Sequence, residues 1–169
     1  MRLEGSKLVA VGGAGLIGSH TVDALLKEGV AEIVVFDNFA RGSAENLEQA
    51  LHDPRLVIVE GDIGDSSALR NAFSGADGVF HFAALWLRHC YEHPREGFDV
   101  NVAGMFNVLE ACRDAEVGRL VFSSSASVYG DALEKLGYPD RGAISAYAHG
   151  RDYHNVLKKS LRVLAAWIH

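Results

Sequence analysis

Residues 7 to 20 read Lys-Leu-Val-Ala-Val-Gly-Gly-Ala-Gly-Leu-Ile-Gly-Ser-His, and this stretch decides the fold. Its glycines Gly12, Gly15 and Gly18 predict a sharp turn from a strand into a helix, whose backbone can approach a diphosphate closely. The first turn of that helix would offer free N–H groups and a positive dipole end to the anion. Because glycines also occur in ordinary turns and helix caps, this prediction depends on the residues that follow.

Length and charge exclude several classes of protein. The chain has 169 residues, the size of one domain, with a net charge of −6 and a pI near 5.7. Nucleic acids and anionic membranes bind clustered Lys and Arg, so we expect neither as a partner. No signal-like or bilayer-spanning apolar run is evident, which favours a cytoplasmic protein. The two cysteines, Cys90 and Cys112, are expected to be buried, reduced thiols.

Short apolar strands alternate with amphipathic helices as far as residue 123. We expect strands at 8–11, 32–36, 55–60, 78–84 and 119–123, and helices at 16–28, 44–52, 66–74 and 96–115. Ser66 or Ser67 is the expected cap of the third helix. The alternation predicts an α/β fold, a doubly wound parallel sheet of the Rossmann type, with five strands and helices on both faces. Residues 1–169 are expected to form a single domain of this kind.

Polar or small residues follow the predicted strands where a ligand of such a sheet binds. Asp37 ends the second strand about twenty residues beyond the last glycine, where a carboxylate accepts hydrogen bonds from a dinucleotide ribose. The alternative is that Asp37 initiates a turn before Asn38 and Gly42. Its distance from the glycine turn favours the ribose role. The other strand ends expected at the same edge are Asp62, Ala83 and Ser123.

At this point the motifs together resemble the extended short-chain dehydrogenase/reductase family. More narrowly, the chain is similar to the NAD-dependent epimerases and dehydratases of nucleotide sugars, of which the UDP-glucose 4-epimerases are best known. The motifs are Gly12-Gly-Ala-Gly-Leu-Ile-Gly-Ser-His20, Asp37-Asn38, Gly61-Asp62-Ile63, His81-Phe82-Ala83-Ala84, Asn101-Val-Ala-Gly104 and Ser123-Ser-Ser-Ala-Ser-Val-Tyr-Gly130. One departure is Val11, where the family usually has threonine.

The resemblance implies NAD as the cofactor and gives each matched residue a role. Leu16 and Ile17 would lie on the diphosphate, and Asp62 and Ile63 beside the adenine. A carboxylate at position 37 would repel the 2′-phosphate of NADP, although Arg41 is close by. The residues assigned to the cofactor in this way are Gly12, Gly15, Leu16, Ile17, Gly18, Asp37, Asn38, Arg41, Asp62, Ile63, Phe82, Ala83, Ala84, Asn101 and Ser123. For Asn101, a purely structural amide between the fourth and fifth strands is the alternative.

The resemblance also implies catalytic residues, with one departure. Ser125 matches the serine that binds the reacting sugar hydroxyl. The family further uses Tyr-x-x-x-Lys, in which lysine holds the nicotinamide ribose and lowers the pKa of the tyrosine. Here Tyr147 is the best candidate, but Arg151 stands at the lysine position. A planar guanidinium is a poor substitute for a compact ammonium group at a tight site.

The tail of the chain departs further from the family. From about Leu133 onward the family pattern is no longer recognisable, and the chain ends at His169, before the family's substrate domain. We therefore expect a truncated or rearranged member. Two functions remain open: an NAD-dependent nucleotide-sugar epimerase or dehydratase, and a dinucleotide-binding module without activity of its own. The resemblance also implies a homodimer formed through the helix at about 96–115 and the helix that carries the tyrosine.

Two further features have more than one interpretation. His89 and His93, with Cys90 between them, have a spacing that binds metal on a helix. No third ligand is evident and Pro94 favours a loop or a helix start, so we expect no metal site. Trp86 follows the fourth strand and is interpreted either as a core residue or as part of a pocket floor.

Overall fold

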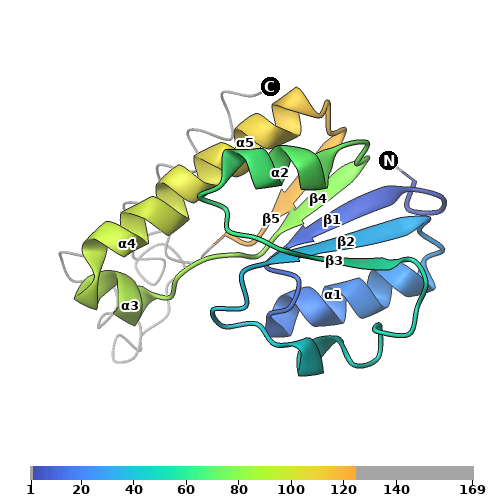
Figure 1. Ribbon diagram of the computed structural model, residues 1–169, viewed down its shortest axis with the longest axis horizontal. Helices are drawn as coiled ribbons and strands as arrows, with labels where there is room; N and C mark the ends of the chain where they lie inside the picture. Colours follow the sequence, from blue (N-terminus) through green and yellow to red (C-terminus); the bar gives the residue numbers. More distant parts are fainter. Residues whose placement is uncertain (1, 125–169) are drawn as a thin grey trace, which may run out of the picture. The chain divides into compact units, whose positions relative to one another are not determined.

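A five-stranded parallel sheet forms the centre of the structure. The computed structural model describes residues 2–124. The strands, in the order β3-β2-β1-β4-β5 across the sheet, are β1 (Lys7–Val11), β2 (Glu32–Asp37), β3 (Leu56–Glu60), β4 (Gly78–His81) and β5 (Arg119–Phe122) (Figure 1). All four strand pairs are parallel, and the order of connection reverses at the β1–β4 pair. This is the predicted doubly wound Rossmann sheet.

The chain divides into two compact units, which are described separately. The first contains residues up to Ala84 together with Phe106–Ser123, and so includes the whole sheet. Its helices are α1 (Leu16–Lys27), the 3₁₀ turn η1 (Ala44–Leu47), α2 (Ser66–Phe73) and most of α5 (Met105–Asp114). In the second unit, Leu85–Met105 includes α3 (Leu87–Glu92), α4 (Pro94–Phe98) and the π-helical segment η2 (Asp99–Gly104).

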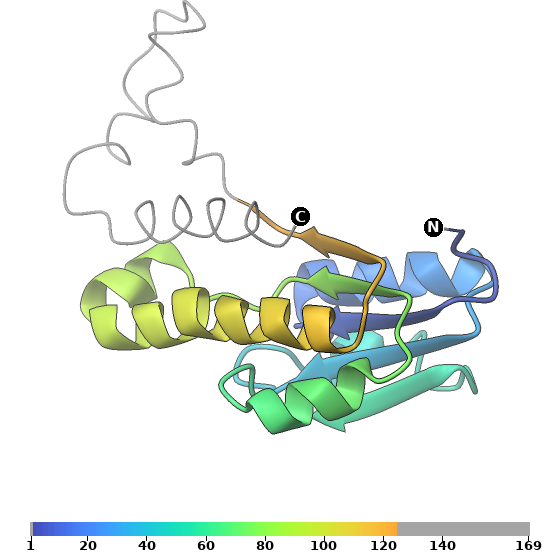
Figure 2. The same cartoon turned by 90° about the horizontal axis from the view of Figure 1, so that it is seen from above.

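Helices cover both faces of the sheet in the first unit. Figures 1 and 2 show α1 on one face and α2 with α5 on the other. Leu8 and Ala10 of β1 belong to the buried cluster that also contains Val22 and Leu25 of α1. The alternate residues of β1, Val9 and Val11, are buried as well. Strands covered on both faces must be apolar throughout, which explains why β1 and β2 read as continuous apolar runs.

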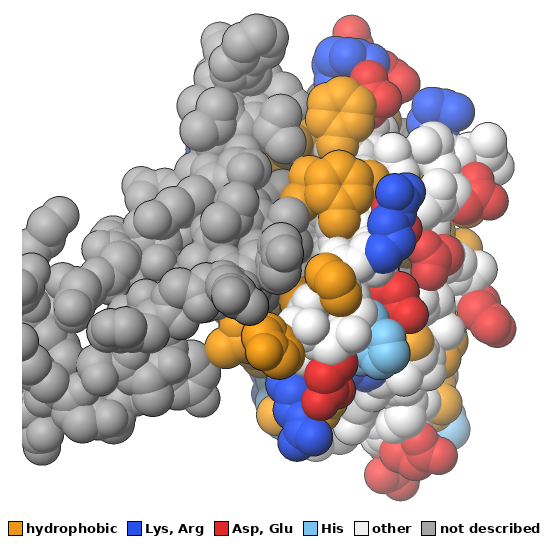
Figure 3. All heavy atoms as spheres, turned by 90° about the vertical axis from the view of Figure 1, so that its left-hand side faces the viewer, with side chains coloured by type: hydrophobic (Ala, Val, Ile, Leu, Met, Phe, Trp, Pro, Cys, Tyr) orange, Lys and Arg blue, Asp and Glu red, His pale blue; other side chains and the backbone are white. Residues whose placement is uncertain are grey.

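The second unit is a pair of short helices that continues into η2. Pro94 occupies the first turn of α4, where its missing N–H costs nothing. Gly97 lies against buried Cys90, since a Cβ at position 97 would come within 3.0 Å of the Cys90 Sγ atom. Figure 3 shows hydrophobic side chains lying among charged ones on the described surface. Trp86 is exposed, so its interpretation as a core residue is wrong.

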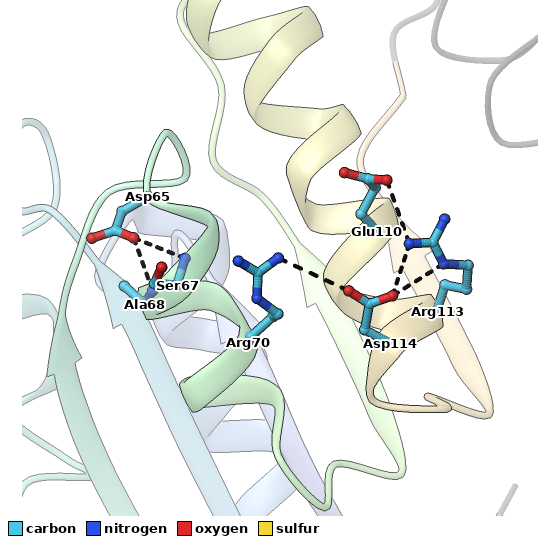
Figure 4. A network of polar contacts seen from close by, with 7 residues as sticks. All are labelled: Asp65, Ser67, Ala68, Arg70, Glu110, Arg113 and Asp114. Atoms are coloured by element: carbon cyan, nitrogen blue, oxygen red, sulfur yellow. Dashed lines mark hydrogen bonds and ion pairs between the residues drawn. The ribbon is translucent and has the colours of Figure 1, made fainter.

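A polar network orders α2 and joins it to α5 (Figure 4). The Asp65 carboxylate accepts hydrogen bonds from the backbone N–H groups of Ser67 and Ala68, at 2.8 and 3.0 Å. Asp65 is therefore the N-cap, and the prediction of a serine cap is wrong, because an ionised carboxylate one residue earlier reaches both free N–H groups. Arg70 Nη1 of α2 lies 3.9 Å from Asp114 Oδ2 of α5.

Several predicted boundaries are wrong for local reasons. The predicted helix at 44–52 is only the 3₁₀ turn η1 followed by turns, because Ser43 N–H and the Asn46 amide both bind the Ala14 carbonyl and tether this segment. The predicted helix at 96–115 consists of α4, η2 and α5, with buried Asn101 in the π-helical part. The fourth strand ends at His81, since Phe82 N–H and Ala83 N–H both donate to the Val11 carbonyl.

Two simpler expectations concern membranes and thiols. Within residues 2–124, no helix is long and apolar enough to cross a membrane. Both cysteines are buried and neither forms a disulfide, as the sequence predicts. Burial raises the pKa of the Cys112 thiol from its ordinary 9.0 to about 12.

This pKa shift predicts a loss of stability at alkaline pH. Between about pH 9 and pH 12 the unfolded chain releases the Cys112 proton while the folded chain keeps it, so the free energy of unfolding falls as pH rises. The contribution is at most about 1.4 kcal/mol per pH unit. The free energy of unfolding, measured with urea from about pH 8 upward, should fall less steeply with pH for Cys112→Ala than for the wild type. Leu109→Ala, which also truncates a buried α5 side chain, should keep the wild-type slope; equal slopes in all three proteins would contradict the prediction.

Candidate functional site

The glycine turn between β1 and α1 is built for close backbone approach. Gly12 has a positive φ of 77°, and its N–H donates to the Phe36 carbonyl at 2.8 Å. A Cβ at position 12 would lie 2.5 Å from the backbone nitrogen of Ala83, and a Cβ on Gly18 would collide with the Gly12 carbonyl oxygen. The turn therefore requires glycine at both positions, as the sequence indicates.

The amino-terminal turn of α1 is open to an anion. Its N-cap is Gly15, which supplies no side-chain hydrogen bond, and no acidic residue lies in the first turn. Leu16 and Ile17 are 69% and 64% exposed, so apolar side chains surround this helix end. Unpaired N–H groups and the positive end of a twelve-residue helix favour a phosphate here.

Asp37 ties the end of β2 to the glycine turn. Its Oδ2 accepts the Ala14 N–H and its Oδ1 accepts the Phe39 N–H, both at 2.9 Å. The side chain is only 8% exposed. The turn-initiating role that the sequence left open is therefore present. A ribose contact stays a prediction, and each carboxylate oxygen has a second lone pair with which to accept a hydroxyl.

The segments after β2 and β3 are joined by a side-chain pair. Asn38 Nδ2 donates to Asp62 Oδ2 at 2.7 Å, and Gly64 N–H donates to Asp62 Oδ1 at 2.7 Å. Asn38 Oδ1 in turn accepts the Ala40 N–H at 3.0 Å. Each of these two exposed side chains is thus fixed by bonds at both of its polar atoms. Since parallel strands end at one edge, Asn38 and Asp62 share the edge of the sheet that carries the glycine turn (Figure 1).

The segments after β4 and β5 complete this edge. Phe82, Ala83 and Ala84 are half-buried and directly follow β4, with Ala83 against Gly12. The Ser123 N–H donates to the His81 carbonyl at 3.1 Å. The first unit therefore brings together the predicted residues of the glycine turn and of all four remaining strand ends.

Other predicted residues are not placed at this edge by the structure. Asn101 belongs to the second unit and is 3% exposed. Its Oδ1 accepts the Leu85 N–H at 2.8 Å and its Nδ2 donates to the Leu85 carbonyl at 3.0 Å. These bonds to backbone are those of a structural amide, the alternative role considered for Asn101. A cofactor contact of Asn101 stays a prediction. Ser125, Tyr147 and Arg151 lie outside the described residues.

Two asparagines that the sequence did not single out hold this edge in place. Asn46 Nδ2 donates to the Ala14 carbonyl at 2.8 Å, and Asn107 Nδ2 donates to the Ile63 carbonyl at 2.9 Å. Ile63 itself is buried. Both partners are more than thirty residues away in sequence, and carboxamides are common on helices and turns, so spacing carries no signal for either contact.

The two histidines on and after α3 form a polar cluster with a carboxylate. His89 Nε2 lies 2.7 Å from Glu96 Oε2, and His93 Nδ1 lies 3.9 Å from Glu96 Oε1. The hydrogen bond to His89 lowers the pKa of Glu96. Among residues 2–124, no group of three or more His, Cys, Asp or Glu side chains is placed to hold a metal ion.

Comparison with known sequences identifies similar proteins. A profile described as the NAD dependent epimerase/dehydratase family matches residues 8–154. UDP-glucose 4-epimerases from Lacticaseibacillus casei and Yersinia enterocolitica are 39% identical over 127 residues and 42% identical over 129 residues. Each alignment covers 73% of this chain but only 37% or 38% of the relative. The matched part of the chain thus spans well under half the length of these curated relatives.

Solved structures show the same relationship. The dTDP-glucose 4,6-dehydratase DesIV from Streptomyces venezuelae, with NAD and TYD bound, matches with a TM-score of 0.81 and 31% identity, over 96% of this chain and 51% of that chain. The UDP-N-acetylglucosamine 4-epimerase from Methanobrevibacter ruminantium M1, in complex with UDP-N-acetylmuramic acid, matches with a TM-score of 0.81 and 28% identity, over 98% and 51% of the two chains.

The contact of Gly12 with Ala83 gives a direct test of the turn. Gly12→Ala should unfold at lower denaturant than Gly5→Ala, although both glycines have positive φ, of 77° and 74°. The shared strain costs about 1–2 kcal/mol. Only position 12 adds a collision, because a Cβ on Gly5 meets nothing within 4 Å. We expect an extra cost of about 1–3 kcal/mol from this overpacking. Equal midpoints in urea would mean that the turn tolerates a side chain.

Proposed function

This chain belongs to the NAD-dependent epimerase/dehydratase family, and we propose that it binds NAD along the carboxyl edge of its sheet. The diphosphate lies at the amino-terminal turn of α1, beside Leu16 and Ile17. The adenosine ribose lies at Asp37 and Asn38, and the adenine lies at Asp62 and Ile63. Phe82 to Ala84 line the middle of the cofactor.

One observation carries this proposal: the uncapped amino terminus of α1 and the pair of side chains Asn38 and Asp62 flank the same buried anchor, Asp37. Asp37 holds the glycine turn through Ala14. The anion site and the ribose site are thus fixed relative to each other before any ligand arrives. A dinucleotide has its diphosphate and its adenosine ribose adjacent, which suits this arrangement.

The reaction we propose is hydride transfer at a carbon of a nucleotide sugar. NAD supplies the hydride acceptor, while Ser125 binds the reacting hydroxyl and Tyr147 takes its proton. Several relatives are named UDP-glucose 4-epimerase, so UDP-glucose and UDP-galactose are the substrates to test first. A homodimer and a cytoplasmic location accompany this proposal.

A second function is a dinucleotide-binding module without its own activity. It is favoured by Arg151, which stands where the catalytic pair of the family has lysine. A guanidinium keeps the positive charge but is a poor substitute for a compact ammonium group at a tight site. Under this alternative the carboxyl edge of the sheet binds NAD as above, and no sugar is converted.

Binding at the α1 terminus is tested by adding a carboxylate there. Leu16→Glu should weaken NAD binding by about tenfold or more, because the new charge faces the diphosphate. The same change favours the helix itself, since acidic residues stabilise an amino-terminal turn, so stability should not fall. Leu51→Glu is the matched control, because Leu51 is also an exposed leucine, at 45%, and lies outside the site. Calorimetric titration measures the affinity of each variant for NAD. Similar affinities for the two variants would show that the diphosphate does not bind at α1.

Activity separates the two proposed functions. The full chain should bind NAD more tightly than NADP, since Asp37 repels a 2′-phosphate. An assay with UDP-glucose, in the presence of NAD, then reports formation of UDP-galactose. Turnover supports the enzyme, whereas NAD binding without turnover supports the binding module. Failure to bind either dinucleotide contradicts both.

A further inference from the structure

We propose that Asn107 is a positioning residue that sets the adenine end of the NAD site. Its Nδ2 donates to the Ile63 carbonyl at 2.9 Å, and this bond joins α5 to the segment between β3 and α2. The inference rests on the proposed function, because it concerns residues to which we have assigned the adenine. Asn107 itself acts through Ile63.

The bond matters because it fixes the segment at Ile63, between its other anchors at Gly61, Asp62 and Asp65. Residues 61–65 belong neither to a strand nor to a helix. Here Gly61 N–H binds the Asp37 carbonyl and Asp65 N–H binds the Asp62 carbonyl. The Ile63 carbonyl is fixed from outside the segment by Asn107. Without this donor the Ile63 carbonyl must turn toward water, and it would carry with it the Ile63–Gly64 peptide, whose N–H holds Asp62 Oδ1.

The position of Asp62 determines which base the site accepts. Oδ1 and Oδ2 each accept one hydrogen bond, from Gly64 N–H and Asn38 Nδ2, and each keeps a second lone pair. A carboxylate held in this way can receive the amino group of adenine. Hypoxanthine has an oxo group in place of that amino group, and an oxo group is an acceptor that a carboxylate repels. Discrimination between the two bases therefore reports where Asp62 is held.

Asn46 provides a control with the same chemistry at the other end of the site. Its amide also donates to a backbone carbonyl, that of Ala14 in the glycine turn, at 2.8 Å. Replacing either asparagine by aspartate removes the donor and adds one negative charge. Loss of the Asn46 bond disturbs the diphosphate end, which NAD and its hypoxanthine analogue share. Loss of the Asn107 bond disturbs the end at which they differ.

The experiment is calorimetric titration of the full chain with NAD and with nicotinamide hypoxanthine dinucleotide. The wild type should prefer NAD. Asn107→Asp and Asn107→Leu should lose affinity for NAD by about tenfold and bring the ratio of the two affinities close to one. Asn46→Asp should weaken both ligands by a similar factor and keep the wild-type ratio. Thermal unfolding of each variant establishes that it is folded.

The results separate the positioning role of Asn107 from the proposed binding of NAD. If the wild type binds neither dinucleotide, the proposed function fails. If it binds NAD but does not distinguish the analogue, or if both Asn107 variants keep the wild-type ratio, the positioning role is wrong and the proposed function stands. Unfolding of both Asn107 variants also overturns the inference, since Asn107 would then hold the fold and not the site.

Discussion

The site depends on the contact between Gly12 and the segment that follows β4. Backbone meets backbone there, with room at position 12 for a hydrogen atom only. This closeness lets the turn after β1 lie against Ala83 while its next residues reach Asp37 on the other side. Neighbouring strand ends therefore meet around one turn. The open end of α1 is placed at that junction because the helix begins where the turn ends.

Much of this arrangement could be predicted from the sequence. Buried parallel strands need apolar side chains on both faces, so β1 and β2 appear as unbroken runs, and their ends are marked by Gly12 and Asp37. The same logic located every strand to within three residues at either end. The predicted family, its Rossmann sheet and its link to NAD are confirmed by the matching profile and by the related solved structures. The assignment of individual residues to NAD stays a prediction.

What the sequence could not reveal depends on hydrogen bonds whose partners are not marked by residue type. Asn46 and Asn107 act on carbonyl groups, which every residue has, so neither partner is marked by its side chain. The π-helical segment η2 reads Asp-Val-Asn-Val-Ala-Gly, mostly weak helix formers that do not mark a π-helix by type, and its buried Asn101 binds the backbone of Leu85. Residue type does not single out Asp65 as the cap, because the serines that follow it are equally good candidates. Such choices are settled by geometry and not by residue preference.

Ala14 holds the glycine turn through its backbone N–H and carbonyl groups, and not through its side chain. Its N–H binds Asp37, its carbonyl accepts from Ser43 and Asn46, and Gly42 lies against it so closely that a Cβ there would come within 2.8 Å. An alanine scan passes over such a residue, and substitution probes only its size. Its contribution would be exposed by chemical synthesis that replaces one amide by an ester. In related sequences, we expect the residues at positions 37, 42 and 46, which contact the Ala14 backbone, to change together.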